Sequence, residues 1–183
     1  MRALTTEQYK TIIRTIKTGS SLFRSNPRIA AALTAEANLG IRIGDVLNLR
    51  LSDIIRDGDR YRLNIVEEKT GKKRTFSVPD EVYQFLRDYA KQQNISSTDL
   101  LFPITVRAVQ KHLKTVCDYL GYADVSTHSF RKWYATEIYR NNGYDIALVQ
   151  RLLQHSSAAV TQRYIGIEPQ RIEKAIEGHA ELI

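Results

Sequence analysis

The chain has little cysteine, proline or glycine and no long apolar run. Cys117 is the only cysteine among 183 residues, so no internal disulfide can form, and the four histidines are scattered without zinc-site spacing. No stretch approaches the roughly 18 apolar residues of a membrane span, and no N-terminal run resembles a signal peptide. These absences favour a reducing, intracellular location and argue against a membrane or zinc protein.

What the chain does contain is typical of one globular domain. Hydrophobic residues make up 43% and charged residues 26%, and no tract is compositionally biased, so a substantial core is expected. The 27 Lys and Arg against 20 Asp and Glu give a net charge of +7. This excess favours a polyanionic partner, most commonly nucleic acid, although a merely basic protein is the simpler alternative.

The apolar periodicity predicts a mostly helical α+β fold with one small sheet. Helices are expected through residues 4–50, where Pro27 suits a helix start and Gly40 a helix end. Alternating runs in residues 52–79, separated by "DGD" and "KTGKK", predict about three antiparallel strands. Helical patterns return from residue 80 onward, and one of them makes Cys117 a core residue.

Two short segments hold arginines that are candidates for a functional role, and the second of them could bind a phosphate. Arg42 stands between two isoleucines at a helix junction, and Asp45 can lie on the same helical face and orient it. His128 and Arg131 are spaced i, i+3 near a helix N-terminus, where anions are favoured. Taken singly, the first pair also suits a structural ion pair, and the second suits a surface helix.

The hairpin and the C-terminal helices contribute further candidates. The turn "EEKTGKKRTF" brings together four cations, which suit either a solvated turn or a DNA groove: Lys69, Lys72, Lys73 and Arg74. In "LLQHSSAAVTQRYIG", His155 ends one helix and Tyr164 follows one short helix later. Tyr164 is one of ten tyrosines, so ordinary packing is its simplest explanation in isolation.

Taken together, these stretches resemble the catalytic domain of the tyrosine recombinases, which include phage and conjugative-element integrases and Xer-type resolvases. The resemblance is carried by "LGIRIGDVL", "EEKTGKKRTFSVP", "THSFRKWYAT" and "LLQHSSAAVTQRYIG", in the family's order and spacing over nearly the whole chain. Two positions depart from the family. Gln154 stands where many members have glycine, and Lys132 stands where histidine is frequent.

The resemblance implies an activity and a role for each candidate. Such an enzyme cleaves and rejoins double-stranded DNA at specific sites through a 3′-phosphotyrosine bond, for a phage, transposon or conjugative element. By position, Tyr164 is the nucleophile and Asp45 supports the first arginine; the other catalytic residues are Arg42, Lys69, His128, Arg131 and His155. No cofactor, metal ion or ATP is implied. The residues expected to contact DNA are Lys72, Lys73, Arg74 and Lys132.

Three other function classes compete with this one. A metal-dependent nuclease needs convergent carboxylates, but the adjacent Glu67 and Glu68 should face opposite sides, while Asp57 and Asp59 sit in a tight turn. A type IB topoisomerase shares the same catalytic residue types and would relax DNA without joining two sites. A catalytically inactive DNA-binding member of the family would need no tyrosine at position 164.

The resemblance also predicts organisation and partners. Residues 1–167 are expected to form the catalytic core, without the N-terminal core-binding domain that usually precedes it. Residues 168–183 read as an amphipathic tail that docks on its own domain or on a neighbouring protomer. A homo-oligomer on DNA is expected, tetrameric in the synapse, in the cytoplasm of a bacterium and with no membrane partner.

Overall fold

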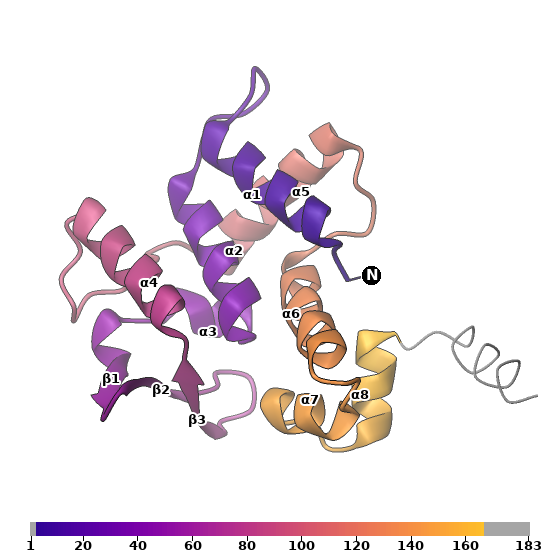
Figure 1. Cartoon of the computed structure of the whole chain (residues 1–183). Coiled ribbons are helices and arrows are strands. Elements are labelled where there is room, and N and C mark those ends of the chain that lie inside the picture. The colour runs from indigo at the N-terminus through magenta and orange to yellow at the C-terminus, as the bar shows by residue number, and fades with distance from the viewer. Residues whose placement is uncertain (1–2, 167–183) are drawn as a thin grey trace, which may run out of the picture. The chain divides into compact units, whose positions relative to one another are not determined.

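A computed structural model of the chain describes residues 3–166 and shows a mostly helical fold with one small sheet (Figure 1). In chain order its helices are α1 (Thr6–Thr18), α2 (Pro27–Leu39), α3 (Ile43–Leu47), the 3-10 turn η1 (Leu51–Asp53), α4 (Asp80–Gln92), α5 (Val106–Leu120), α6 (Thr127–Asn141), α7 (Ile146–Leu153) and α8 (Ala158–Ile165). The expected fold class is confirmed. The predicted tail, residues 168–183, lies outside the described residues.

Side chains at the helix ends explain where the helices start and stop. Thr5 accepts a hydrogen bond from the backbone N–H of Gln8, and the Gln8 side chain accepts one from the backbone of Thr5, which closes a capping box before α1. Pro27 is the first residue of α2, and Gly40 ends that helix in the left-handed conformation, with φ of 61°. The predicted helix start at Pro27 and helix end at Gly40 are confirmed.

The sheet contains strands β1 (Ile54–Asp57), β2 (Arg60–Val66) and β3 (Lys73–Val78) in the antiparallel order β1-β2-β3. A two-residue turn joins the first two strands, and Gly58 supplies the positive φ that this turn requires. Leu63 and Val78 face the core, whereas Val66 is 62% exposed. One face of the sheet is therefore buried and the other is solvated.

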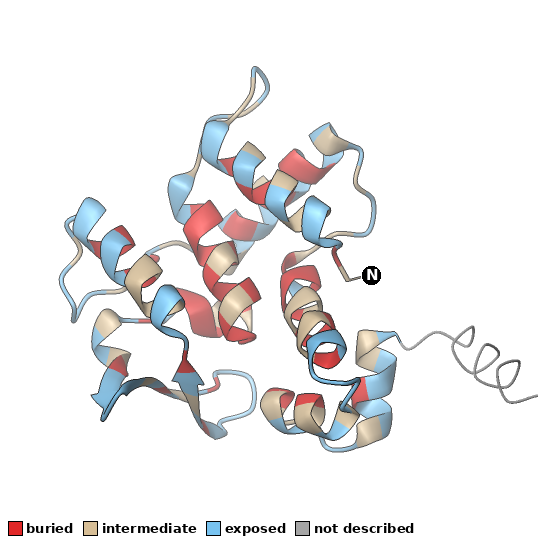
Figure 2. Ribbon diagram, viewed as in Figure 1, coloured by how far each residue is buried: buried red, intermediate tan, exposed pale blue. Residues whose placement is uncertain are grey.

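The chain divides into two compact units, and the boundary follows Tyr134 within α6. The first unit holds a large apolar core, in which buried residues fill much of α2 and α3 (Figure 2). Its largest fully buried side chains include Phe102, Phe130, Ile12, Ile16 and Leu33. Cys117 is 3% exposed and belongs to this core, as predicted.

The second unit, from Ala135 onward, has a smaller core of its own. This core contains the buried residues Ala135, Tyr139, Val149 and Leu153, and α7 packs against α8. Across residues 3–166, none of the helices is both long and apolar enough to cross a bilayer.

Candidate active site

Arg42 stands at the junction of α2 and α3, as the sequence predicts. Its backbone is extended and precedes the first residue of α3. A Cβ added to Gly40 would lie 2.2 Å from a ring carbon of Tyr134, so glycine is needed both for the positive φ and for this close approach. The neighbouring Ile41 and Ile43 are buried, while the Arg42 side chain is 23% exposed. The buried isoleucines thus anchor the junction, and the Arg42 guanidinium stays accessible to solvent.

The carboxylate of Glu67 lies between two guanidiniums. Arg42 Nη1 donates to Glu67 Oε2 at 2.7 Å, and Arg74 Nη1 lies 3.5 Å from Oε1. Burial alone would raise the pKa of Glu67, but hydrogen bonds from Arg42 and Thr70, together with nearby positive charge, including that of Arg131, hold this pKa below its ordinary value. Glu67 is therefore ionised at neutral pH.

Asp45 supports the turn after β2. Its Oδ1 accepts a hydrogen bond from the backbone N–H of Glu68 at 2.9 Å, and the residue is 6% exposed. Among the described residues, the ion pair of Arg42 is with Glu67 and not with Asp45. The expected i, i+3 contact is not formed because Arg42 precedes the helix with an extended backbone and so does not lie on a helical face.

Helix α6 carries His128 and Arg131 in its first turns. Arg131 is 2% exposed, so its charge is shielded from bulk water. The pKa of His128 is below its ordinary value; partial burial is the largest cause, followed by four nearby cations, Arg131, Arg42, Lys69 and Lys132. His128 is consequently neutral at pH 7 and able to accept a proton.

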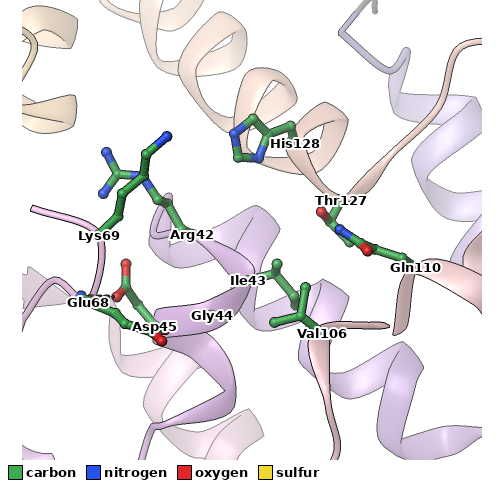
Figure 3. A pocket seen from close by; sticks show the side chains of 10 residues that line it. All are labelled: Arg42, Ile43, Gly44, Asp45, Glu68, Lys69, Val106, Gln110, Thr127 and His128. Carbon is green, nitrogen blue, oxygen red and sulfur yellow. Dashed lines mark hydrogen bonds between the residues drawn. The ribbon is translucent and has the colours of Figure 1, made fainter. Parts of the chain in front are cut away.

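Three of the predicted catalytic residues line one pocket of about 430 Å³ in the first unit (Figure 3). Arg42 comes from the α2–α3 junction, Lys69 from the turn between β2 and β3, and His128 from the start of α6. Segments far apart in the sequence therefore deliver two cations and a neutral imidazole to the same space. This combination suits an anionic group such as a phosphodiester.

The predicted DNA contacts differ in exposure. Lys72 and Lys73 are exposed, and Lys132 is half-buried. Arg74 is not at the exposed tip of the hairpin: its side chain is 4% exposed, and its guanidinium lies 4.7 Å from the centre of the Phe76 ring. The reason is that β3 already begins at Lys73, so strand alternation turns the next side chain inward.

His155 and Tyr164 come together within the second unit. Gln154 ends α7 in the left-handed conformation, and His155 Nδ1 lies 3.1 Å from Thr161 Oγ1 of α8. The rings of His155 and Tyr164 meet edge to face, with centroids 5.1 Å apart. Tyr164 also packs against the core of this unit, which Leu153 helps to form. The pair is thus locally fixed.

A second buried carboxylate, Glu36, lies on α2 and is 0% exposed. Burial raises its pKa well above the ordinary value, and the charge of Arg131 opposes this only in part. Because the pKa is higher in the folded chain than in the unfolded one, the proton adds stability below the unfolded pKa. That stability is lost as pH rises through the folded pKa.

We therefore expect Glu36→Gln, which cannot ionise, to stabilise the chain increasingly as pH rises. The gain over wild type should be small near pH 5 and reach about 1 kcal/mol or more by pH 8.5, or about 2–4 °C in Tm. Thermal melts across this pH range measure it. The exposed Glu81→Gln is the control and should show no such divergence. Parallel pH profiles for wild type and Glu36→Gln would contradict the assignment.

Glu67 and Glu36 are the residues that sequence reasoning missed. Leu63, Ile65 and Glu67 are spaced two residues apart, so their side chains lie on the same, core-facing side of the strand. Glu67 is the charged residue of this set and lies two residues before Lys69. Glu36 interrupts the apolar run "AAALTAEANLG". A charge at a core position is the signal that could have identified both. Within residues 3–166, no group of three or more His, Cys, Asp or Glu could hold a metal ion.

The chain matches known proteins over most of its length. The model of the phage integrase family matches residues 2–171. The probable integrase/recombinase YoeC of Bacillus subtilis is 32% identical over 136 residues, which are 72% of this chain and 73% of that protein. The tyrosine recombinase XerC of Caldanaerobacter subterraneus is 30% identical over 159 residues, covering 80% of this chain and 43% of that protein.

The fold is also found among solved structures. The site-specific recombinase XerH, solved bound to a palindromic difH substrate, superposes with a TM-score of 0.70 at 20% identity. The match covers 96% of this chain and 52% of that one, so the chain spans about half the length of these Xer proteins. The similarity confirms the expected recombinase catalytic-domain fold.

Proposed function

The chain belongs to the phage integrase family, and we propose that it is a site-specific recombinase that cleaves and rejoins DNA through a 3′-phosphotyrosine intermediate. The observation that carries this proposal is the pocket where Arg42, Lys69 and His128 converge. The net charge of +7 supports a DNA partner, and XerH, which shares the fold, was solved on its DNA substrate.

In the proposed cleavage step, the Tyr164 hydroxyl attacks phosphorus. The bond between Tyr164 Oη and phosphorus forms as the bond from phosphorus to the 5′ oxygen breaks. The tyrosine proton passes to His128, whose lowered pKa leaves it neutral at pH 7, and Lys69 protonates the leaving oxygen. Attack by a 5′-hydroxyl of a second strand reverses these steps and releases the tyrosine.

Fixed cations stabilise the transition state of this reaction. The phosphorane carries extra negative charge on its equatorial oxygens, and the guanidiniums of Arg42 and Arg131 can each donate two hydrogen bonds to them. His155 would donate a further hydrogen bond. Because two guanidiniums supply this charge and the phosphotyrosine bond retains the energy of the broken linkage, we expect the reaction to require neither a metal ion nor ATP.

The same proposal extends to partners. The exposed Lys72 and Lys73, with the half-buried Lys132, are the side chains we assign to phosphate contacts outside the pocket. We also propose assembly as a homo-oligomer on DNA, a tetramer when two sites are joined, acting on cytoplasmic DNA. Docking of the tail of residues 168–183 on a neighbouring protomer remains a prediction.

Covalent capture tests the proposed function without knowledge of the target sequence. The chain is incubated, without added metal, with a library of duplexes that carry a randomised segment and a nick. After denaturation in SDS, protein-linked strands are recovered and sequenced. Recovery of a shared sequence supports site-specific cleavage and supplies the substrate for later experiments. No covalent DNA under any salt condition would contradict the proposal.

The pKa of His128 predicts how cleavage depends on pH. With DNA below saturation, the rate reports the free protein, in which this pKa lies below 6.5. If neutral His128 accepts the tyrosine proton, the rate should be constant from pH 7 to 8 and should fall as pH drops below 6.5. Single-turnover adduct formation on the captured duplex measures this profile. His128→Gln should be slower and lack the inflection, whereas an unchanged inflection would assign it to another group.

A further inference from the structure

Arg42, which lines the pocket, belongs to a cluster of three charged side chains whose other members, Glu67 and Arg74, do not line it. Glu67 is at the centre of the cluster, with Arg42 Nη1 at 2.7 Å and Arg74 Nη1 at 3.5 Å. Glu67 and Arg74 are 1% and 4% exposed. Burying such groups carries a desolvation cost that apolar residues of similar size would avoid, so the pairs are a weak source of stability. A role in the reaction explains them better.

The same carboxylate also organises the turn that carries Lys69. Thr70 Oγ1 donates to Glu67 Oε2 at 2.8 Å. The backbone N–H of Glu67 donates to the carbonyl of Lys72 at 3.0 Å, and the N–H of Gly71 donates to the carbonyl of Glu67 at 2.8 Å. The Glu67 side chain thus holds both the Arg42 guanidinium and Thr70 of the lysine turn, and the Glu67 backbone holds the turn as well.

We propose that Glu67 is a positioning residue for the DNA cleavage reaction, acting together with Arg74; this inference rests on the proposed function. By binding Nη1, Glu67 fixes the plane of the Arg42 guanidinium and leaves its other donors for a phosphate. Because the same group fixes the turn, the position of Lys69 relative to Arg42 is set before DNA arrives. Such preorganisation is effective in catalysis because reacting groups need not be ordered during the reaction.

Arg74 offsets the negative charge that Glu67 places beside Arg42. A lone carboxylate beside Arg42 would cancel the charge that attracts a phosphate. With Arg74 on the other oxygen, the three groups together keep a net positive charge, so the carboxylate can orient Arg42 without neutralising the site. On this account, Arg74 acts from strand β3 through Glu67 and does not itself touch DNA, unlike the role that the sequence predicted.

The opposite role, in which Glu67 occupies the place of the phosphate and inhibits the empty site, does not fit the geometry. The pocket is lined by ten residues, including Arg42, Lys69 and Glu68, but Glu67 is not among them (Figure 3). A competitor for the phosphate would have to enter that space. The two roles also predict opposite results for removal of the charge.

Glu67→Gln keeps the size of the side chain and removes its charge. At saturating DNA, we expect the first-order rate of adduct formation to fall by about tenfold to a hundredfold, because Arg42 and the turn are less well fixed. DNA affinity should be unchanged or slightly tighter, since the net charge rises by one. Asp59→Asn, which makes the same charge change at a side chain that is 94% exposed, should leave the rate unchanged.

A second pair of variants keeps the test decisive if Glu67→Gln alone proves unstable in thermal melts. Arg74→Gln leaves Glu67 uncompensated beside Arg42, so both rate and DNA affinity should fall. Adding Glu67→Gln to Arg74→Gln removes the uncompensated charge, and affinity should return to that of wild type while the rate stays low. A merely structural pair would not separate affinity from rate in this way.

The outcomes distinguish this inference from the function on which it rests. Wild type that forms no adduct contradicts the proposed function itself. Wild type that forms adduct at the same rate as a folded Glu67→Gln variant overturns only the positioning role. A faster Glu67→Gln would likewise overturn it, in favour of an inhibitory carboxylate. Loss of rate with unchanged or tighter binding is the result that supports it.

Discussion

Replacing Tyr164 with phenylalanine should abolish covalent attachment to DNA while leaving the fold and DNA affinity intact. The substitution removes only the oxygen that we assign as nucleophile. The ring that remains can keep its edge-to-face contact with His155, at 5.1 Å between centroids, and its packing in the second core. Denaturing gels of the captured duplex measure the adduct, and gel shifts measure affinity. If the Tyr164→Phe variant still forms the adduct, another residue is the nucleophile.

Two controls make this result specific. Tyr144→Phe alters a half-exposed tyrosine of the same unit and should leave cleavage unchanged. The second control gives the Tyr164→Phe variant a duplex whose 3′ end carries a p-nitrophenyl phosphate. Attack by a 5′-hydroxyl then expels nitrophenolate, which needs no tyrosine and is seen by its absorbance. Joining of this substrate by the variant would show that the rest of the site is intact.

Local signals made much of the fold predictable. Thr5, Pro27 and Gly40 mark helix ends through hydrogen bonds and φ preferences that act within four residues. The Gly-containing turn at Gly58 and the alternation around Leu63 likewise indicate the hairpin. These features depend on neighbours in the chain, so the sequence alone is enough to find them.

The support of the site was not predictable because it depends on contacts across long sequence separations. Glu67 meets Arg42 across 25 residues, and periodicity gives no account of such a pair. The burial of Arg74 depends on the residue at which β3 begins. Because side chains alternate along a strand, a shift of one residue would turn the Arg74 side chain from the buried face of the sheet to the exposed face. Asp45 was assigned to Arg42 from helical spacing, but its partner is the backbone of Glu68.

Arg131 influences several ionisable groups of the first unit at once. Arg131 is 2% exposed and acts on the ionisation of both buried carboxylates, Glu36 and Glu67, and of His128. Arg131 can therefore contribute to the reaction in two ways: its charge lowers the pKa of His128, and its planar pair of N–H donors can bind the phosphorane. Substitutions that remove one or both of them should have different signatures.

Arg131→Lys should lower the rate of adduct formation by about 10²- to 10³-fold, because lysine keeps the charge but cannot offer the planar pair of donors. Since the charge is kept, the pH inflection assigned to His128 should stay near its wild-type position. Arg131→Gln should be at least as slow and should also move that inflection to higher pH. The sign follows because Arg131 is the first of the cations that lower the pKa of His128.

Single-turnover rates of both variants from pH 5 to 8 on the captured duplex measure the two effects, with thermal melts to establish that each variant is folded. Lys132→Gln is the matched control: it removes the neighbouring cation, which ranks last among those acting on His128, and should shift the inflection least. Equal profiles for Arg131→Lys and Arg131→Gln would mean that charge plays no separate part. The contribution of Arg131 to stabilising the phosphorane would then rest on its planar pair of hydrogen-bond donors.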